Sequence, residues 1–334
     1  MRNLVSAGNV PTVSRQPPIR IGARGSKLSL AQSGLMQVRI ARALGVPAGA
    51  SKEEIEAVAP LIPIVTSGDR IQDRRLMEIG GKGLFTKEIE EALLDGRIDC
   101  AVHSLKDMPA ELPPGLVLAA TPEREDPRDA FISHVCERLE DLPKGARLGT
   151  ASLRRQAQAL HVRPDLEIVM LRGNVDTRLA KLERGEADAI LLAQSGLNRL
   201  GLGELTKSWL DPDACPPAPG QGALVIETRA EDIGAPWLEA VRCHETAIAV
   251  AAERGALYAL EGSCRTAIGA RAILAGARLS MVVEALTPDG AQRFRRHGEV
   301  VLTGADDVGE ARALGLKLGG EVRAEGGDAI LPPE

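Results

Sequence analysis

Residues 147–193 read RLGTASLRRQAQALHVRPDLEIVMLRGNVDTRLAKLERGEADAILLA, and short apolar runs alternate here with segments of helical periodicity. Three apolar runs predict strands, at 147–150, 167–173 and 189–193. Ser152 and Asn174 occupy N-cap positions, so they predict the starts of the two intervening helices. Strands that alternate with helices are typical of parallel sheets covered on both faces. The stretch therefore predicts an α/β fold.

The same alternation occupies the first two thirds of the chain. Further strands are predicted at 19–23, 61–65, 100–104 and 116–120, with helices from Ser26 and over about 87–94. After the Pro/Gly-rich stretch 211–223 the pattern changes. It predicts one more strand at 223–229, a long helical region over 235–260, three alternating strand runs and a final helix near 305–322. This tail is typical of a smaller α+β domain.

Composition limits the class of protein. Of 334 residues, 44% are hydrophobic and 26% charged, a balance typical of soluble globular proteins. No apolar run approaches the roughly 18 residues that a membrane helix needs, and the segment 1–18 lacks the apolar stretch of a secretory signal. We therefore predict a cytoplasmic protein without a membrane partner. Residues 1–18 are interpreted as a polar leader, with an organellar transit remnant as the alternative.

Charge and cysteine content exclude further classes. A net charge of -5 and 2% aromatic residues argue against a nucleic-acid-binding surface. Five cysteines are scattered without a C-x-x-C pair, which argues against a disulfide framework or a structural zinc site. We expect reduced thiols, mostly buried, and Cys100 fits a buried strand. Cys264, in a turn of LYALEGSCRTAIG flanked by glycine, is expected to be presented.

Cations recur where predicted strands lead into helices. Five arginines occupy such junctions: Arg24, Arg154, Arg155, Arg172 and Arg178. Ligands of open α/β sheets bind beyond the carboxyl ends of strands, where helix N-termini favour anions. The pattern predicts a small ligand with several carboxylates or phosphates. The alternative is that each arginine reaches solvent or an acidic neighbour.

Two segments could carry chemistry. HSLKDMP (103–109) follows a predicted strand, and Pro109 bars helix continuation, so His103, Lys106 and Asp107 are expected on a turn. Asp107 would then stabilise a cation that forms on the substrate, or it would serve only as a local cap or ion-pair partner. GGKGLF (80–85) lacks the spacing of a P-loop. It is interpreted as a flap carrying Lys82, with a plain surface loop as the alternative.

Seven blocks of the sequence resemble the porphobilinogen deaminase (hydroxymethylbilane synthase) family in order and spacing. They are HSLKDMP, GGKGLFTKEIE, EREDPRDAF, SLRRQ, LRGNVDTRL, PGQGAL and LEGSC. The resemblance covers nearly everything from residue 19 onward. It implies two periplasmic-binding-protein-like α/β domains hinged around a cleft, and a smaller C-terminal α+β domain. Their expected bounds are 19–121 with 222–240, 122–221, and 241–334.

The resemblance also implies a reaction. Such enzymes join four porphobilinogen units head to tail with loss of ammonia, on a covalent dipyrromethane primer, and release hydroxymethylbilane by hydrolysis. A monomer that acts on this small substrate, without a metal, is expected. The primer would be linked by a thioether to Cys264, and Asp107 would be the catalytic carboxylate.

The remaining roles follow residue by residue from positions that match the family, within these blocks and in ARGSK (23–27) and GLNRLG (196–201). Residues expected to hold the primer are Lys106, Ser152, Arg154, Arg155 and Arg172. Residues expected to bind substrate carboxylates are Arg24, Ser26, Arg178, Arg199 and Lys82. The chain departs from the family pattern at Glu78, Ala151 and Ser263, which replace the usual lysine, serine and glycine. These departures leave Asp107 and Cys264 in place.

Two other functions compete with this interpretation. A non-catalytic module that closes two hinged lobes on a carboxylate ligand would explain the arginines, but it would leave the third domain and Cys264 unexplained. A phosphate-ester enzyme is disfavoured because the sequence contains neither a P-loop nor a carboxylate cluster suited to Mg²⁺.

Overall fold

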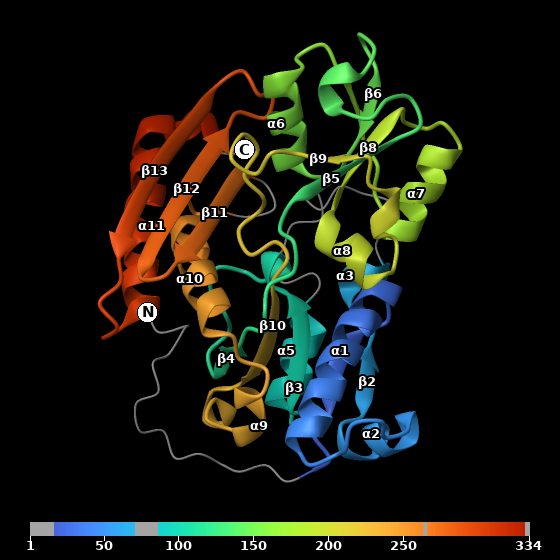
Figure 1. The fold of residues 1–334 in the computed structure, drawn as a ribbon, viewed down its shortest axis with the longest axis vertical. Coiled ribbons are helices and arrows are strands. Elements are labelled where there is room, and N and C mark those ends of the chain that lie inside the picture. The colour runs from blue at the N-terminus through green and yellow to red at the C-terminus, as the bar shows by residue number, and fades with distance from the viewer. Residues whose placement is uncertain (1–16, 71–85, 263–265, 331–334) are drawn as a thin grey trace. The chain divides into compact units, whose positions relative to one another are not determined.

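The computed structural model describes residues 17–70, 86–262 and 266–330 (Figure 1). These residues form two compact units. Unit 1 contains residues up to 70, 86–124 and 223–247, and unit 2 contains 125–222 and the residues from 248 onward. The three-domain division given above stays a prediction. Within the described ranges, no helix combines the length and apolar character required to span a membrane.

Unit 1 is built on a five-stranded sheet, sheet A, with the order β2-β1-β3-β10-β4. Its strands are β1 (Ile21–Arg24), β2 (Leu61–Ile64), β3 (Cys100–Ser104), β4 (Leu116–Ala120) and β10 (Leu224–Arg229). β1 runs parallel to β2 and β3, whereas β10 is antiparallel to both β3 and β4. Its helical segments are α1 (Lys27–Ala43), α2 (Lys52–Val58), α3 (Ser67–Arg70), α5 (Lys87–Leu94), η1 (Leu105–Asp107), η4 (Ala230–Asp232) and α9 (Pro236–Glu239).

Unit 2 repeats this plan in sheet B, with the order β7-β6-β8-β5-β9. Its strands are β5 (Asp129–Ser133), β6 (Arg147–Gly149), β7 (Glu167–Val169), β8 (Ala189–Ala193) and β9 (Ser208–Trp209). β6 is parallel to β7 and β8, and β5 is antiparallel to β8 and β9. Its helical segments before the tail are η2 (Leu139–Asp141), α6 (Leu153–Val162), α7 (Val175–Glu183), α8 (Gln194–Arg199) and η3 (Gly203–Leu205). The prediction of parallel sheets is therefore confirmed for four strands of each of these two sheets and is wrong for β10 and β5, which run antiparallel to their neighbours.

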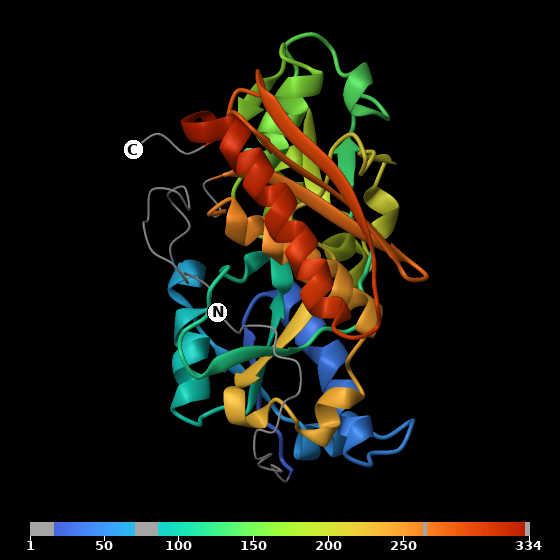
Figure 2. The ribbon, with the colours of Figure 1, turned by 90° about the vertical axis from the view of Figure 1, so that its left-hand side faces the viewer.

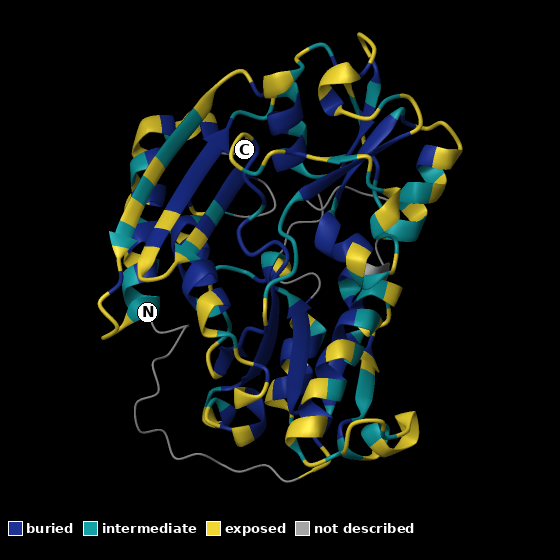
Figure 3. Cartoon of the chain, in the orientation of Figure 1, coloured by how far each residue is buried: buried dark blue, intermediate teal, exposed yellow. Residues whose placement is uncertain are grey.

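Both sheets carry a hydrophobic core on each face, as predicted for covered α/β sheets. Successive strand residues point to opposite faces. Cys100 and Val102 of β3 therefore join one core with α1 and α9, and Ala101 joins the other core with α5. In sheet B, Leu191 packs toward α6 while its neighbours in β8 pack toward α7 and α8. β10 is buried throughout and β3 is buried from Cys100 to His103, and Figure 3 shows the buried centre of this sheet.

The tail forms a three-stranded antiparallel sheet, sheet C, and two long helices. The strands are β11 (Ala267–Ala275), β12 (Arg278–Leu286) and β13 (Arg293–Val301), and the helical segments are α10 (His244–Ala259), α11 (Asp307–Gly326) and η5 (Gly327–Ile330). Figure 2 shows α11 lying along this sheet. Gly315 of α11 approaches α10 so closely that a Cβ would collide with the Ala252 carbonyl oxygen. The predicted three strands and final helix are confirmed, and so is the α+β class of the tail.

One predicted helix is in fact two. The region 235–260 divides into α9 and α10, with a break over 240–243. At this break the Cys243 N–H donates to the Thr121 carbonyl, at 2.7 Å. A tertiary hydrogen bond thus takes a donor that a continuous helix would use internally.

Candidate active site

Sheet A gathers four of the predicted site residues at one edge. β1 and β3 are parallel, so their carboxyl ends lie at the same edge of the sheet. Arg24 ends β1, and Ser26 caps α1 by accepting a hydrogen bond from the Ser29 N–H at 3.3 Å. Lys106 and Asp107 follow β3 in η1. This edge therefore brings together Arg24, Ser26, Lys106 and Asp107.

Hydrogen bonds hold the backbone on both sides of Asp107, while the Asp107 side chain is exposed. Buried Leu105 donates its N–H to the Ala223 carbonyl at 3.0 Å, and the Met108 N–H donates back to the Leu105 carbonyl at 3.1 Å. Gln32 of α1 donates to the Ser104 hydroxyl at 3.0 Å. The predicted turn at the carboxyl end of a strand is confirmed for Lys106 and Asp107. A fixed backbone with an exposed carboxylate suits a group that acts on a ligand.

His103 is not on the turn, contrary to the prediction. It belongs to β3 and is buried, with Nε2 3.0 Å from Glu227 Oε2 of β10. His103 also affects Glu90. Burial raises the pKa of Glu90, while the interactions with Thr86 and His103 act to lower it. The error arises because β3 extends to Ser104 and both faces of sheet A are covered, so the chain turns only after His103.

Sheet B presents a second edge of the same kind. β6, β7 and β8 are parallel, so the segments after them share one edge. Ser152 caps α6 by accepting from the Arg155 N–H at 3.4 Å, and Asn174 caps α7 by accepting from the Thr177 N–H at 2.9 Å. Both predicted helix starts are confirmed.

The loop after β7, helix α7 and the end of α8 contribute one further arginine each. Arg172 lies half-buried in that loop, and its carbonyl accepts from Lys181 Nζ at 3.3 Å. Arg178 folds back from α7, so that its Nε donates to the Gly173 carbonyl at 2.8 Å. Arg199 ends α8 and donates from Nη2 to the Gly222 carbonyl at 2.7 Å. Burial lowers the pKa of Arg199, and the charge of Glu125 opposes this shift.

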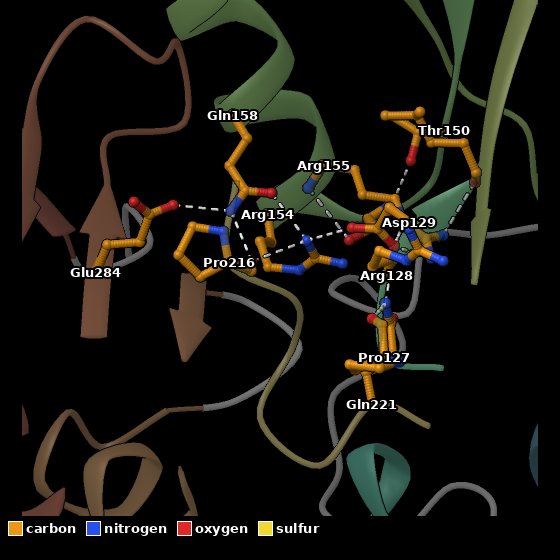
Figure 4. Close-up of polar contacts among 12 residues, drawn as sticks. Pro127, Arg128, Asp129, Thr150, Arg154, Arg155, Gln158, Pro216, Gln221 and Glu284 are labelled. Atoms are coloured by element: carbon orange, nitrogen blue, oxygen red, sulfur yellow. Dashed lines mark hydrogen bonds and ion pairs between the residues drawn. The ribbon is translucent and has the colours of Figure 1, made fainter. Parts of the chain in front are cut away.

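Arg154 and Arg155 lie in the first turn of α6, as predicted, but both are buried against Asp129 (Figure 4). Arg154 Nη1 is 2.6 Å from Asp129 Oδ2, and Arg155 Nη2 is 2.8 Å from Asp129 Oδ1. Burial acts to raise the pKa of Asp129, but the two guanidinium charges and their hydrogen bonds hold it well below its ordinary range. For Arg154 and Arg155, the alternative prediction that each junction arginine pairs with an acidic neighbour is therefore confirmed. Pairing with Asp129 and binding of a ligand are compatible.

Asp129 is the functional candidate that sequence reasoning missed. It lies inside the quoted block EREDPRDAF, yet β5 was not among the predicted strands and Asp129 received no role. The sequence contains one indication of its role, because Asp129 is an acidic residue at the start of the apolar run DAFIS. A carboxylate that is buried with such a strand needs a cationic partner.

Two predicted site residues, Cys264 and Lys82, lie outside the described residues, as does the rest of the predicted flap. Cys100 is buried as expected, and burial raises the pKa of its thiol. The four described cysteines are free, but Cys136 and Cys243 are only half-buried. In the described part of the chain, no group of three or more His, Cys, Asp or Glu side chains could hold a metal ion.

The chain matches two family models and several curated proteins. The family model "Porphobilinogen deaminase, dipyromethane cofactor binding domain" matches residues 19–235, and "Porphobilinogen deaminase, C-terminal domain" matches 247–324. Porphobilinogen deaminase of Caulobacter vibrioides (strain NA1000 / CB15N) is 92% identical, covering 96% of this chain and 100% of the relative. That of Caulobacter sp. (strain K31) is 82% identical over the same shares. Among solved structures, a periplasmic substrate-binding protein of an ABC transporter from Coxiella burnetii aligns with a TM-score of 0.38 and 18% identity, covering 67% of this chain and 89% of that one.

Proposed function

The chain belongs to the porphobilinogen deaminase family, and from this premise we propose which of its residues carry the family's reaction. The enzyme condenses four porphobilinogen units head to tail, with loss of ammonia at each step, and releases hydroxymethylbilane by hydrolysis. Its cofactor is dipyrromethane. The proposal concerns the roles of the individual side chains.

Asp107 is the catalytic carboxylate of this proposal. As ammonia leaves porphobilinogen, positive charge develops on the pyrrole unit, and a fixed anion beside it lowers the free energy of the transition state. The observation that carries the proposal is the exposed Asp107 side chain on a backbone held by Leu105 and Met108. Neighbouring Lys106 adds a cation suited to a carboxylate of the bound chain.

Arginines would hold the acetate and propionate side chains. Arg24, Ser26, Arg178, Arg199 and Lys82 are proposed to bind substrate carboxylates, and Lys106, Ser152, Arg154, Arg155 and Arg172 to bind those of the cofactor. One observation fits this assignment. Arg154 Nε is buried and has no hydrogen-bond partner within the described residues, so an anionic group would satisfy a donor that is otherwise unpaired.

Cys264 is proposed to hold the cofactor through a thioether, on the strength of the LEGSC block. When bound, dipyrromethane supplies the pyrrole carbon to which substrate units are added. The arginines keep the carboxylates of the chain oriented, and Asp107 faces the charge that develops. We also propose that the protein is cytoplasmic and that it is a monomer, as expected for the family. Sedimentation of the purified protein would test the oligomeric state.

Turnover by Asp107→Asn tests the catalytic assignment. The amide keeps the shape of the side chain and removes its charge, so porphobilinogen consumption should fall on the order of 100-fold or more. Glu111→Gln is the matched control, because Glu111 is also exposed and lies four residues away. It should retain wild-type turnover. Ordinary activity of Asp107→Asn would remove Asp107 from the proposed role.

A further inference from the structure

Asp129 is a carboxylate fully enclosed at the functional edge of sheet B. It begins β5, paired with Ala193 of β8, and its side chain is completely buried. It accepts hydrogen bonds from both neighbouring arginines and from Gln221 Nε2 at 2.9 Å (Figure 4). One negative charge therefore faces two guanidinium ions. The cluster keeps one net positive charge, which favours a further anion.

The two arginines of this cluster are engaged differently. Arg155 donates from Nε and Nη2 to Asp129 Oδ1, at 3.0 and 2.8 Å, and from Nη1 to the Leu191 carbonyl at 3.0 Å. All three of its nitrogens have partners, on strands β5 and β8. Arg155 thus fastens two strands of the sheet together.

Arg154 is held from one side only. Its Nη1 approaches three acceptors: Asp129 Oδ2 at 2.6 Å, Gln158 Oε1 at 2.8 Å and the Pro216 carbonyl at 3.2 Å. Within the described residues, its Nε and Nη2 have no hydrogen-bond partner, and Nε is buried. The Nε–Nη2 edge is one of the two sides through which a guanidinium pairs with a carboxylate in a bidentate manner. The contacts of Arg154 leave this edge for a ligand.

A second layer fixes Gln158, the other side-chain acceptor of Arg154. Gln158 Nε2 donates to the Pro216 carbonyl and to Glu284 Oε1, both at 2.8 Å. Both amide hydrogens have acceptors, so its oxygen faces Arg154. Glu284 is buried in β12 and also meets Arg295 Nη1 at 3.3 Å. The orientation of Arg154 is thus tied through Gln158 to sheet C.

We propose that Asp129 is a positioning residue, which anchors Arg154 by Nη1 so that the Nε–Nη2 edge receives a carboxylate of the bound pyrrole chain. The inference rests on the proposed function, in which Arg154 holds such a carboxylate. It replaces the cofactor contact proposed above for Arg155 with a structural role, because all three Arg155 nitrogens have partners in the protein. Asp129, in turn, acts through Arg154. Asp129 itself touches no ligand.

A double-mutant cycle in the full-length enzyme tests this inference. Asp129→Asn and Arg154→Lys are made singly and together, and the covalent cofactor content, KM and kcat of each folded enzyme are measured. Misplacing a group that orients the bound chain costs on the order of 100-fold, so each single change should lower kcat/KM or cofactor content by about this factor. The double change should be no worse than Arg154→Lys alone, because both remove one interaction. Arg155→Lys is the comparison and should lower stability more than kcat/KM.

Defects of Asp129→Asn and Arg154→Lys that multiply in the double variant would overturn the inference, as would a wild-type KM and cofactor content in Asp129→Asn. If Asp129→Asn fails to fold, Gln158→Leu is used, since it removes another acceptor of Arg154 Nη1. It should show a smaller loss of the same kind, and wild-type kinetics would contradict the inference. Wild-type enzyme that does not consume porphobilinogen would instead contradict the proposed function.

Discussion

Sheets A and B place an aspartate at comparable edges, and the two aspartates have opposite surroundings. Asp107 follows β3 and exposes its carboxylate, whereas Asp129 begins β5 and is enclosed by two arginines. Both edges combine carboxyl ends of parallel strands with the start of one antiparallel strand. The same topology therefore holds an exposed carboxylate in one unit and a buried, ion-paired carboxylate in the other. This difference in burial and ion pairing matches the two roles proposed above, catalysis for Asp107 and positioning for Asp129.

The largest difference between the two aspartates should appear in stability. Asp129→Ala leaves two buried guanidinium ions without their counter-ion, so the free energy of unfolding of unit 2 should fall by about 3–5 kcal/mol. Asp107→Ala should change the stability of unit 1 by no more than about 0.5 kcal/mol, as expected for an exposed side chain. Urea unfolding of both variants measures the contrast. Equal losses would show that exposure does not separate the two roles.

Two buried glutamines extend the comparison with a smaller expected effect. Gln158→Leu leaves Glu284 and Arg154 each short of a buried hydrogen bond, which should cost about 2–3 kcal/mol. In unit 1, Gln32→Leu removes its contacts with the Ser104 hydroxyl and should cost about 1 kcal/mol. Thermal or urea unfolding of the matched pair gives both values. A larger loss for Gln32→Leu would contradict the central place given to the Asp129 cluster.

The smallest expected effect of Asp129 is on the pH dependence of the free energy of unfolding in acid. Its pKa is lowered in the folded protein, so its contribution to stability is full above the ordinary aspartate pKa of about 3.9 and disappears as the pH falls. Wild-type stability should therefore begin to decline below about pH 5 and should continue to decline below about pH 3, toward the lowered pKa of Asp129 in the folded protein, and the decline should be less steep in Asp129→Asn. Asp188, whose pKa is lowered by its hydrogen bonds to Arg147, is present in both proteins, so its share cancels. Identical slopes would argue against the ion-pair account.

Local pattern in the sequence predicted most elements. The strands at 100–104, 116–120 and 189–193 and the helix at 87–94 match the structure residue for residue. In these segments, the apolar residues that set the periodicity are the residues that the structure buries. Ser26, Ser152 and Asn174 mark helix starts because their side chains accept backbone N–H groups.

The rest depended on contacts between distant residues. The chain returns to sheet A as β10 only after residues 125–222 of unit 2, and β10 then pairs antiparallel to β3. No local pattern in the sequence encodes that direction. Asp129 lies 25 and 26 positions from its arginine partners, so their pairing could not be inferred from spacing. At the break between α9 and α10, the Cys243 N–H likewise pairs with the carbonyl of Thr121, a residue distant in the sequence.

Intact-mass measurement of the purified full-length protein tests whether Cys264 carries the cofactor. The measured mass should exceed that of the 334-residue chain by one dipyrromethane. This added mass should be absent in Cys264→Ser and present in Cys243→Ser. Peptide mapping should place the added mass on Cys264. An unmodified chain that still converts porphobilinogen, or a pyrrole pair attached at another cysteine, would contradict this assignment.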